Sequence, residues 1–197
     1  MEKIKRISTI AITSLYIVMA AYAFFNFGPL LSAKINNASS TSSQESISAG
    51  TEESFWAFSR VLGVSWDEIN AASWSGETLA LGLLAIAIGT VPMFVCLWLL
   101  RTVFKNYREG NIFSDDNASC FRKIGILLIL DALIATSVSE TAFIFAMTFN
   151  NPPGERMISV SVGSPQLYLL FLGLVIFIIS LVMSEASKIH AEQQLTV

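Results

Sequence analysis

Four long runs of apolar residues alternate with polar segments along the chain. They cover residues 7–25, 78–100, 124–147 and 167–183, and each is close to the roughly 20 residues with which an α-helix crosses the hydrocarbon core of a bilayer. Peptide groups surrounded by lipid must bond to one another, so such segments have to be helices. The pattern predicts an all-α integral membrane protein, a four-transmembrane-helix bundle that forms a single membrane domain over residues 1–197.

Four polar segments connect or follow the predicted spans. They are an outer loop at 26–77, an elbow at 101–123, a second outer loop at 148–166 and a tail at 184–197. Nine of the 12 Lys and Arg residues lie on the side of the elbow and tail: Lys3, Lys5, Arg6, Arg101, Lys105, Arg108, Arg122, Lys123 and Lys188. Since cytoplasmic segments carry the excess of basic residues, both termini are predicted to be cytoplasmic.

The first apolar run also has some features of a secretory signal peptide. Basic residues precede it, and Ala21 and Ala23 form a small-x-small cleavage pattern. The run is longer than the roughly 7 to 15 apolar residues of a signal peptide, which favours an uncleaved span.

Composition and charge agree with a membrane protein. Of the 197 residues, 53% are hydrophobic and 14% are charged, against about 25% charged in a typical soluble domain. The net charge of -3 and the absence of a clustered basic surface argue against direct nucleic-acid binding. Cys96 lies in an apolar run and Cys120 in a cytoplasmic segment, so reduced thiols are expected rather than a disulfide.

The first outer loop begins with a Ser/Thr-rich stretch at 36–50 that is typical of a flexible linker. Apolar residues then recur at helical spacing over 55–69, which predicts an amphipathic helix on the outer interface. A lid or ligand-binding element is the alternative. In the second loop, residues 150–154 predict a turn and 157–162 alternate as a strand does.

The elbow combines a helix end with a helix start. Gly110 suits a left-handed C-terminal cap, and Ile112 and Phe113 supply an apolar anchor. Ser114 is a favourable N-cap for a helix that opens with acidic residues, whose charges suit its positive end. Two interpretations remain: a structural elbow that holds two spans together, or a docking surface for a cytoplasmic partner.

Two acidic residues, Asp131 and Glu140, lie inside the third span, where an ionised side chain costs about 2.5 to 3.5 kcal/mol on insertion scales. They are nine positions apart, and at about 100° per residue they would lie on opposite faces of an uninterrupted α-helix. They are expected either to make structural polar contacts or to line a water-filled, transport-linked cavity. Small residues elsewhere in the spans predict close helix packing, namely Gly82, Ala85, Gly89, Gly173 and Ser180.

The elbow and the tail together resemble a bacterial membrane family known as domain-of-unknown-function family 2975. The elbow residues that carry the resemblance are Tyr107, Gly110, Ile112, Phe113, Ser114, Asn117, Arg122, Ile124 and Gly125. The tail residues are Ala186, Ile189, Glu192, Leu195, Thr196 and Val197. The resemblance implies a four-helix inner-membrane protein without an assigned activity. Such proteins are often encoded beside small helix-turn-helix regulators, which implies a regulatory partner.

These features predict a non-catalytic membrane protein of the bacterial inner membrane that signals or scaffolds through its elbow and tail. No catalytic, cofactor or metal site is expected, since the single histidine is His190 in the tail and no nucleophile or phosphate-loop motif occurs. Besides the lipid bilayer, a cytoplasmic protein, a helix-turn-helix regulator and a second copy are candidate partners. Candidate docking residues are Tyr107, Gly110, Ile112, Phe113, Ser114, Asn117, Glu192, Leu195, Thr196 and Val197. Small-solute or ion transport that uses Asp131 and Glu140 is the alternative.

Overall fold

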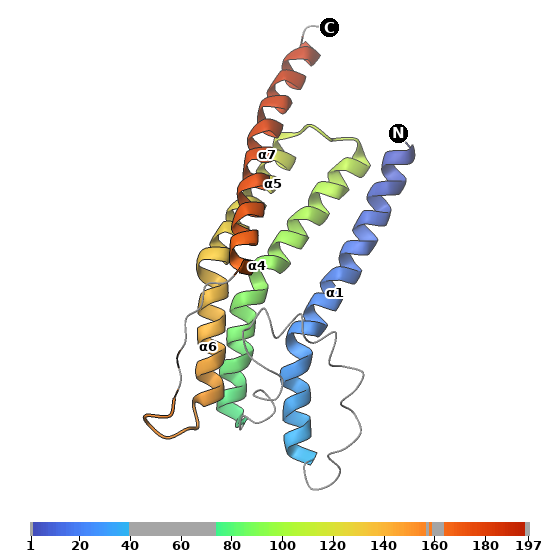
Figure 1. Ribbon diagram of the computed structural model, residues 1–197. Helices are drawn as coiled ribbons and strands as arrows, with labels where there is room; N and C mark the ends of the chain where they lie inside the picture. Colours follow the sequence, from blue (N-terminus) through green and yellow to red (C-terminus); the bar gives the residue numbers. More distant parts are fainter. Residues whose placement is uncertain (1, 40–73, 157, 159–163, 196–197) are drawn as a thin grey trace. The chain divides into compact units, whose positions relative to one another are not determined.

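Every regular element in the described part of the chain is a helix (Figure 1). The computed structural model describes residues 2–39, 74–156, 158 and 164–195. Its elements are α1 (Glu2–Ser39), α4 (Gly76–Glu109), α5 (Asp115–Leu130), the π-helical turn η1 (Asp131–Ala135), α6 (Thr136–Thr148) and α7 (Ser164–Leu195). The predicted all-α fold class is therefore confirmed.

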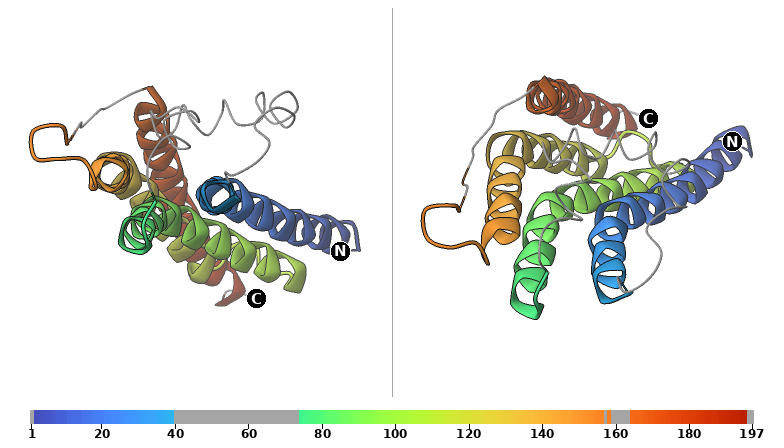
Figure 2. Two further views of the ribbon diagram at one scale, coloured as in Figure 1. Left: turned by 90° about the horizontal axis from the view of Figure 1, so that it is seen from below. Right: turned by 60° about the horizontal axis from the view of Figure 1, so that its bottom comes forward.

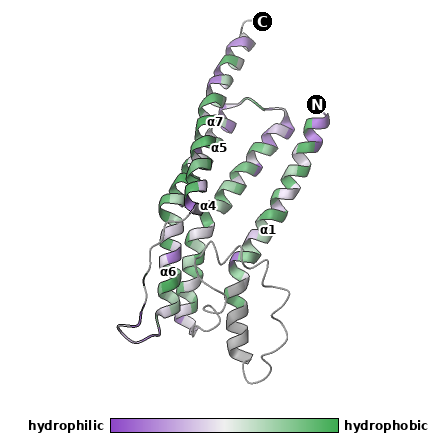
Figure 3. Ribbon diagram, in the orientation of Figure 1, coloured by the Kyte–Doolittle hydropathy of each residue, from purple (hydrophilic) through white to green (hydrophobic). Residues whose placement is uncertain are grey.

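Four helices are long and apolar enough to span a membrane. They are α1, α4, the continuous run of α5, η1 and α6, and α7, and each contains one of the predicted spans. Apolar residues dominate α4 and α7, as Figure 3 shows, and many of them are exposed, including Phe171, Leu172 and Ile178. In water such an apolar surface would be unfavourable, whereas in lipid it needs no protein cover.

The first helix is longer than the sequence pattern suggests. Residues 26–39 were expected in the outer loop, and 36–50 in a linker, yet α1 continues to Ser39. Tertiary packing explains part of the difference, because Leu30 is buried with Phe27 against α4 and α6. Gly28 and Pro29 are poor helix formers, at about 1 and 3 kcal/mol in a helix interior, and the burial of Leu30 offsets about 1.5 to 3 kcal/mol of that cost.

The tail also forms part of a helix, because α7 runs without interruption to Leu195. The predicted turn after the third span is present: the Asn151 N–H donates to the Thr148 carbonyl at 3.0 Å, and Gly154 has a φ of +105°. The amphipathic helix predicted at 55–69 lies outside the described residues. So do the tail end and all of 157–162 except Ile158.

The chain folds as two compact units. The first comprises Met1–Ala21, Val91–Ile134 and Gly163–Val197, so it contains the elbow, α5 and α7. Its core is formed by Cys96, Ile124 and Leu128, with apolar side chains of α4, α5 and α7 packed around them. α5 and α7 lie side by side along much of their length (Figure 2).

The second unit comprises Tyr22–Thr90 and Ala135–Val162. Phe143 of α6 is buried at its centre with Leu30, Leu79, Ala85 and Ile86. Small residues of α4 permit the close approach that their spacing predicts. Gly89 faces Ser139 of α6, whose hydroxyl donates a hydrogen bond of 2.7 Å to the Ala85 carbonyl.

Candidate functional site at the elbow and the tail

Within the elbow, α4 ends in a Schellman motif. The Asn111 N–H donates to the Asn106 carbonyl at 3.0 Å, and the Gly110 N–H donates to the Tyr107 carbonyl at 3.1 Å. Gly110 has a φ of +92°, a left-handed conformation that residues with a Cβ adopt only at a cost. The predicted cap is confirmed.

Asn117 holds the turn between α4 and α5 together. Its side chain is fully buried, and its Nδ2 donates to the carbonyls of Asn111 at 2.7 Å and Ile112 at 3.0 Å. Its Oδ1 accepts a hydrogen bond of 2.8 Å from Asn106 Nδ2. The predicted N-cap is also present, since the Ser114 hydroxyl accepts from the Asn117 N–H at 3.3 Å. One side chain thus connects α4, the turn and α5.

α5 packs against α7, and this packing brings the tail to the elbow. At this crossing Gly125 and Gly173 lie against each other's backbones: a Cβ on Gly125 would be 3.0 Å from the Gly173 carbonyl oxygen and 2.8 Å from the Phe177 nitrogen. Small residues are the ones that permit such contact between membrane helices. Gly125 is one of the residues that carry the family resemblance, and its structural role is to let α5 and α7 come into contact.

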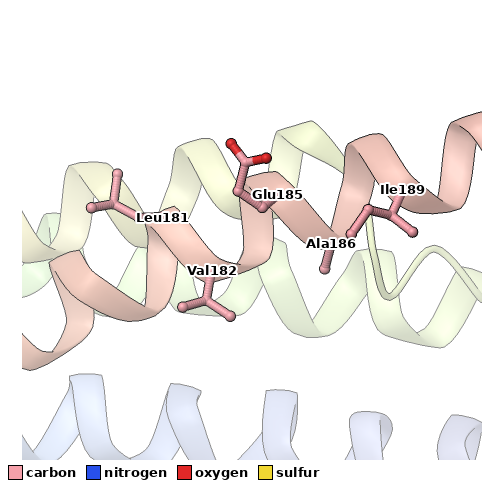
Figure 4. A pocket seen from close by; sticks show the side chains of 5 residues that line it. All are labelled: Leu181, Val182, Glu185, Ala186 and Ile189. Carbon is pink, nitrogen blue, oxygen red and sulfur yellow. The ribbon is translucent and has the colours of Figure 1, made fainter.

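A shallow apolar groove follows α7 from the predicted span into the tail. Two adjoining hollows of about 420 and 260 Å³ form it. We call it the tail groove and define it by Leu181, Val182, Glu185, Ala186, Ile189 and Gln193 of α7 together with Phe113 of the elbow. Figure 4 shows the five residues that line the larger hollow. Phe113 is 51% exposed and Ile189 is 55% exposed, although both are apolar.

Glu185 is the charged residue that lines the groove. Glu185 accepts a hydrogen bond of 2.8 Å from Lys188, and both side chains are well exposed. In the elbow, burial raises the pKa of the Tyr107 phenol. Burial likewise raises the pKa of the Cys120 thiol, as expected for an unreactive cysteine. Tyr107 is therefore neutral at physiological pH and contributes no charge to the site.

The predicted docking residues divide into three groups. Gly110, Ser114 and Asn117 shape the elbow, Tyr107 and Ile112 are half-buried, and Phe113 lies on the groove. Glu192 is exposed on α7, and Leu195 is the last residue of that helix. Thr196 and Val197 lie outside the described residues.

Each of the two intramembrane acids is buried in its own unit, Asp131 at 4% exposure and Glu140 at 5%. Each of the two acids has a polar or electrostatic partner. The expectation of opposite faces assumed an uninterrupted α-helix, and the π-helical turn that begins at Asp131 removes that premise. Within the described residues, no group of three His, Cys, Asp or Glu side chains could hold a metal ion.

The sequence does not indicate the groove, because no local signal pairs Phe113 with residues more than seventy positions away. The spacing of Ala186, Ile189 and Gln193 on one helical face was a partial signal. Only the crossing of α5 and α7 brings that face to Phe113.

Comparison with known proteins identifies a family and no individual relative. No curated protein and no solved structure matches the chain significantly. A family model described as "Protein of unknown function (DUF2975)" matches residues 48–197, which include α4, the elbow, both membrane acids and α7. Since the match covers well over half of the chain, this protein belongs to the DUF2975 family, as its elbow and tail residues indicated.

Proposed function

We propose that the protein is a non-catalytic, multi-pass protein of the bacterial inner membrane that binds a cytoplasmic protein through the tail groove. The groove is the observation that carries the proposal. Phe113 and Ile189 expose apolar side chains outside the predicted spans. Phe113 lies on the turn that Asn117 holds rigid, and Ile189 lies on α7. An apolar surface that water would otherwise contact is a common docking site, and an amphipathic partner helix suits an elongated groove.

The orientation is part of this proposal. The excess of Lys and Arg beside the elbow, the N-terminus and the tail supports a cytoplasmic location for all three. Lys105→Cys tests it, because Lys105 is exposed in the elbow. We expect an impermeant maleimide to label this cysteine only after cells are opened. Labelling in intact cells would overturn the orientation.

Partner binding can be tested with the full chain purified from native membranes in mild detergent. We expect a cytoplasmic protein to co-purify with the wild type in a fixed stoichiometry, with a helix-turn-helix regulator as the candidate that the family resemblance suggests. Phe113→Ser and Ile189→Ser should weaken its binding at least about tenfold, since buried anchor residues each contribute about 2 kcal/mol or more. Ile158→Ser is the matched control, because Ile158 is 66% exposed in the opposite loop.

Deletion of residues 192–197 tests the contribution of the tail separately. If the co-purified partner is retained undiminished after this deletion, docking through the tail end is excluded. If the groove variants instead change the mass of the purified particle and release no other protein, the occupant is a second copy of the chain.

The π-helical turn at Asp131 favours a second candidate function, transport of an ion or small solute. Turns of this kind occur frequently at functional sites, and a buried carboxyl group inside a membrane is a common proton carrier. Glu140→Gln and Asp131→Asn should then abolish flux in liposomes while the protein remains folded, and Glu185→Gln should have no effect because Glu185 is exposed. Unchanged flux in the first two variants would exclude this function.

A further inference from the structure

Arg101 occupies an unusual environment at the end of the second predicted span. It is the first charged residue after the apolar run 78–100 and is half-buried. Its guanidinium carbon lies 4.9 Å from the centre of the Trp98 ring and 5.4 Å from the centre of the Tyr16 ring. Two aromatic side chains, one from α4 and one from α1, therefore frame one cation within the same unit.

No carboxylate of the described residues forms an ion pair with this cation. Its Nε atom is buried and has no hydrogen-bond acceptor in that part of the chain. The ion pair between Lys188 and Glu185 does not involve Arg101. Contact with aromatic rings stabilises a guanidinium but neutralises none of its charge. The remaining N–H groups form a planar fork that matches the oxygens of a phosphate.

The location indicates where that phosphate comes from. Trp98 is 53% exposed and Tyr16 is 45% exposed, and both belong to apolar helical surfaces expected to face lipid. Trp98 lies close to the end of the second predicted span, where aromatic side chains concentrate at the level of lipid headgroups, and the long basic side chain of Arg101 at that span end reaches the same level. Lys105, one turn further along α4 and exposed, adds positive potential on the side of the elbow.

We propose that Arg101, framed by Tyr16 and Trp98, binds the phosphate of an anionic phospholipid in the leaflet on the elbow side of the membrane. The two rings hold the guanidinium in place, and the lipid phosphate neutralises it. This site is separate from the tail groove and does not depend on the identity of any protein partner.

Native mass spectrometry of the full chain in detergent tests the site directly. The probes are phosphatidylglycerol, phosphatidylcholine and inorganic phosphate. We expect phosphatidylglycerol to bind about tenfold more tightly than phosphatidylcholine. Both lipids carry the phosphate, but in phosphatidylcholine the choline cation offsets its charge and repels the guanidinium. Equal binding of the two lipids would overturn the proposal. Binding of inorganic phosphate in place of the lipid would also overturn the proposal, because it would assign the site to a soluble anion.

Four variants locate the binding on the chain. Arg101→Gln should lower the affinity for phosphatidylglycerol about tenfold, and Arg101→Lys should lower it less, because the charge remains without the fork. Trp98→Leu keeps the charge and removes one ring, so it should also weaken binding and remains informative if Arg101→Gln does not fold. Lys105→Gln is the control with the same loss of charge. Equal losses in Arg101→Gln and Lys105→Gln would show diffuse attraction and exclude the framed site.

Discussion

Gly125 of α5 and Gly173 of α7 lie so close that neither backbone leaves room for a side chain on the other. A Cβ on Gly173 would be 3.0 Å from the Gly125 carbonyl oxygen and 3.1 Å from the Ile129 nitrogen. These two atoms belong to the backbone and cannot rotate away, and the Ile129 Cγ1 atom would lie at 2.9 Å as well. The distance between the two helices, and with it the place of the tail beside the elbow, therefore depends on this pair.

Gly125→Ala and Gly173→Ala should each destabilise the protein by about 1 to 3 kcal/mol, because the added methyl group forces the two helices apart. Unfolding in mixed detergent micelles measures the loss. Gly28→Ala is the control, since its Cβ would meet only the edge of the Phe24 ring at 4.0 Å. Equal effects of all three changes would show that helix propensity, and not the crossing, determines the result.

Asn117→Asp should loosen the elbow, because a carboxylate replaces the two N–H donors that satisfy the Asn111 and Ile112 carbonyls. We expect a loss of about 1 to 3 kcal/mol for the unsatisfied groups. Hydrogen exchange of the backbone amides over residues 110–114 should then accelerate. Ser119→Ala, an exposed change two residues further on, should leave the exchange rates as they are. Slow exchange in the Asn117→Asp variant would contradict the assigned role of Asn117.

Gly110→Ala should strain the cap of α4, since its φ of +92° is unfavourable for a residue with a Cβ. The expected cost is about 1 to 2 kcal/mol, and Gly110→Asn should cost less because Asn tolerates this region better. No atom lies within 4 Å of a Cβ at Gly110, so crowding does not contribute. Thermal unfolding of the two variants beside Gly76→Ala, whose added Cβ is equally uncrowded, isolates the backbone effect. An unchanged midpoint of thermal unfolding in Gly110→Ala would show that the left-handed conformation at this position adds no strain.

Gly89 and Ser139 should behave as a coupled pair within the second unit. A Cβ on Gly89 would be 2.6 Å from the Ser139 hydroxyl oxygen and 2.9 Å from its Cβ. Gly89→Ala should thus destabilise the protein, while Ser139→Gly should cost less, since it loses a hydrogen bond worth about 0.6 kcal/mol in a membrane together with limited packing. The double variant should recover part of the stability. Strictly additive losses in a double-mutant cycle would exclude the contact.

Local features of this protein could be predicted because their causes are local. The Schellman end at Gly110 and the cap at Ser114 depend on the conformational preferences of single residues and on hydrogen bonds that span a few positions. The helical state of the four apolar runs follows from lipid, which offers peptide groups no alternative partner. These parts of the fold, together with the small-residue face of α4, were predicted with their residues.

Other features depend on contacts between distant segments. α1 passes residue 25 as a helix while Leu30 is buried against α4 and α6, and a pattern of apolar residues does not contain that contact. The π-helical turn at Asp131 likewise has no sequence signal of its own. The length of α1 and the π-helical turn both depend on which side chains surround the segment.

The candidate site combines the two kinds of cause. The sequence determined that this chain forms apolar helices, that an elbow joins α4 to α5, and that the basic residues gather beside that elbow. Only the tertiary structure decided that Gly125 meets Gly173, that Ile189 lies beside Phe113, and that Tyr16 and Trp98 frame Arg101. The physical reason is that hydrogen bonding within a helix is satisfied by its own segment, whereas the choice of neighbouring faces depends on shape and close packing between helices that are remote in sequence.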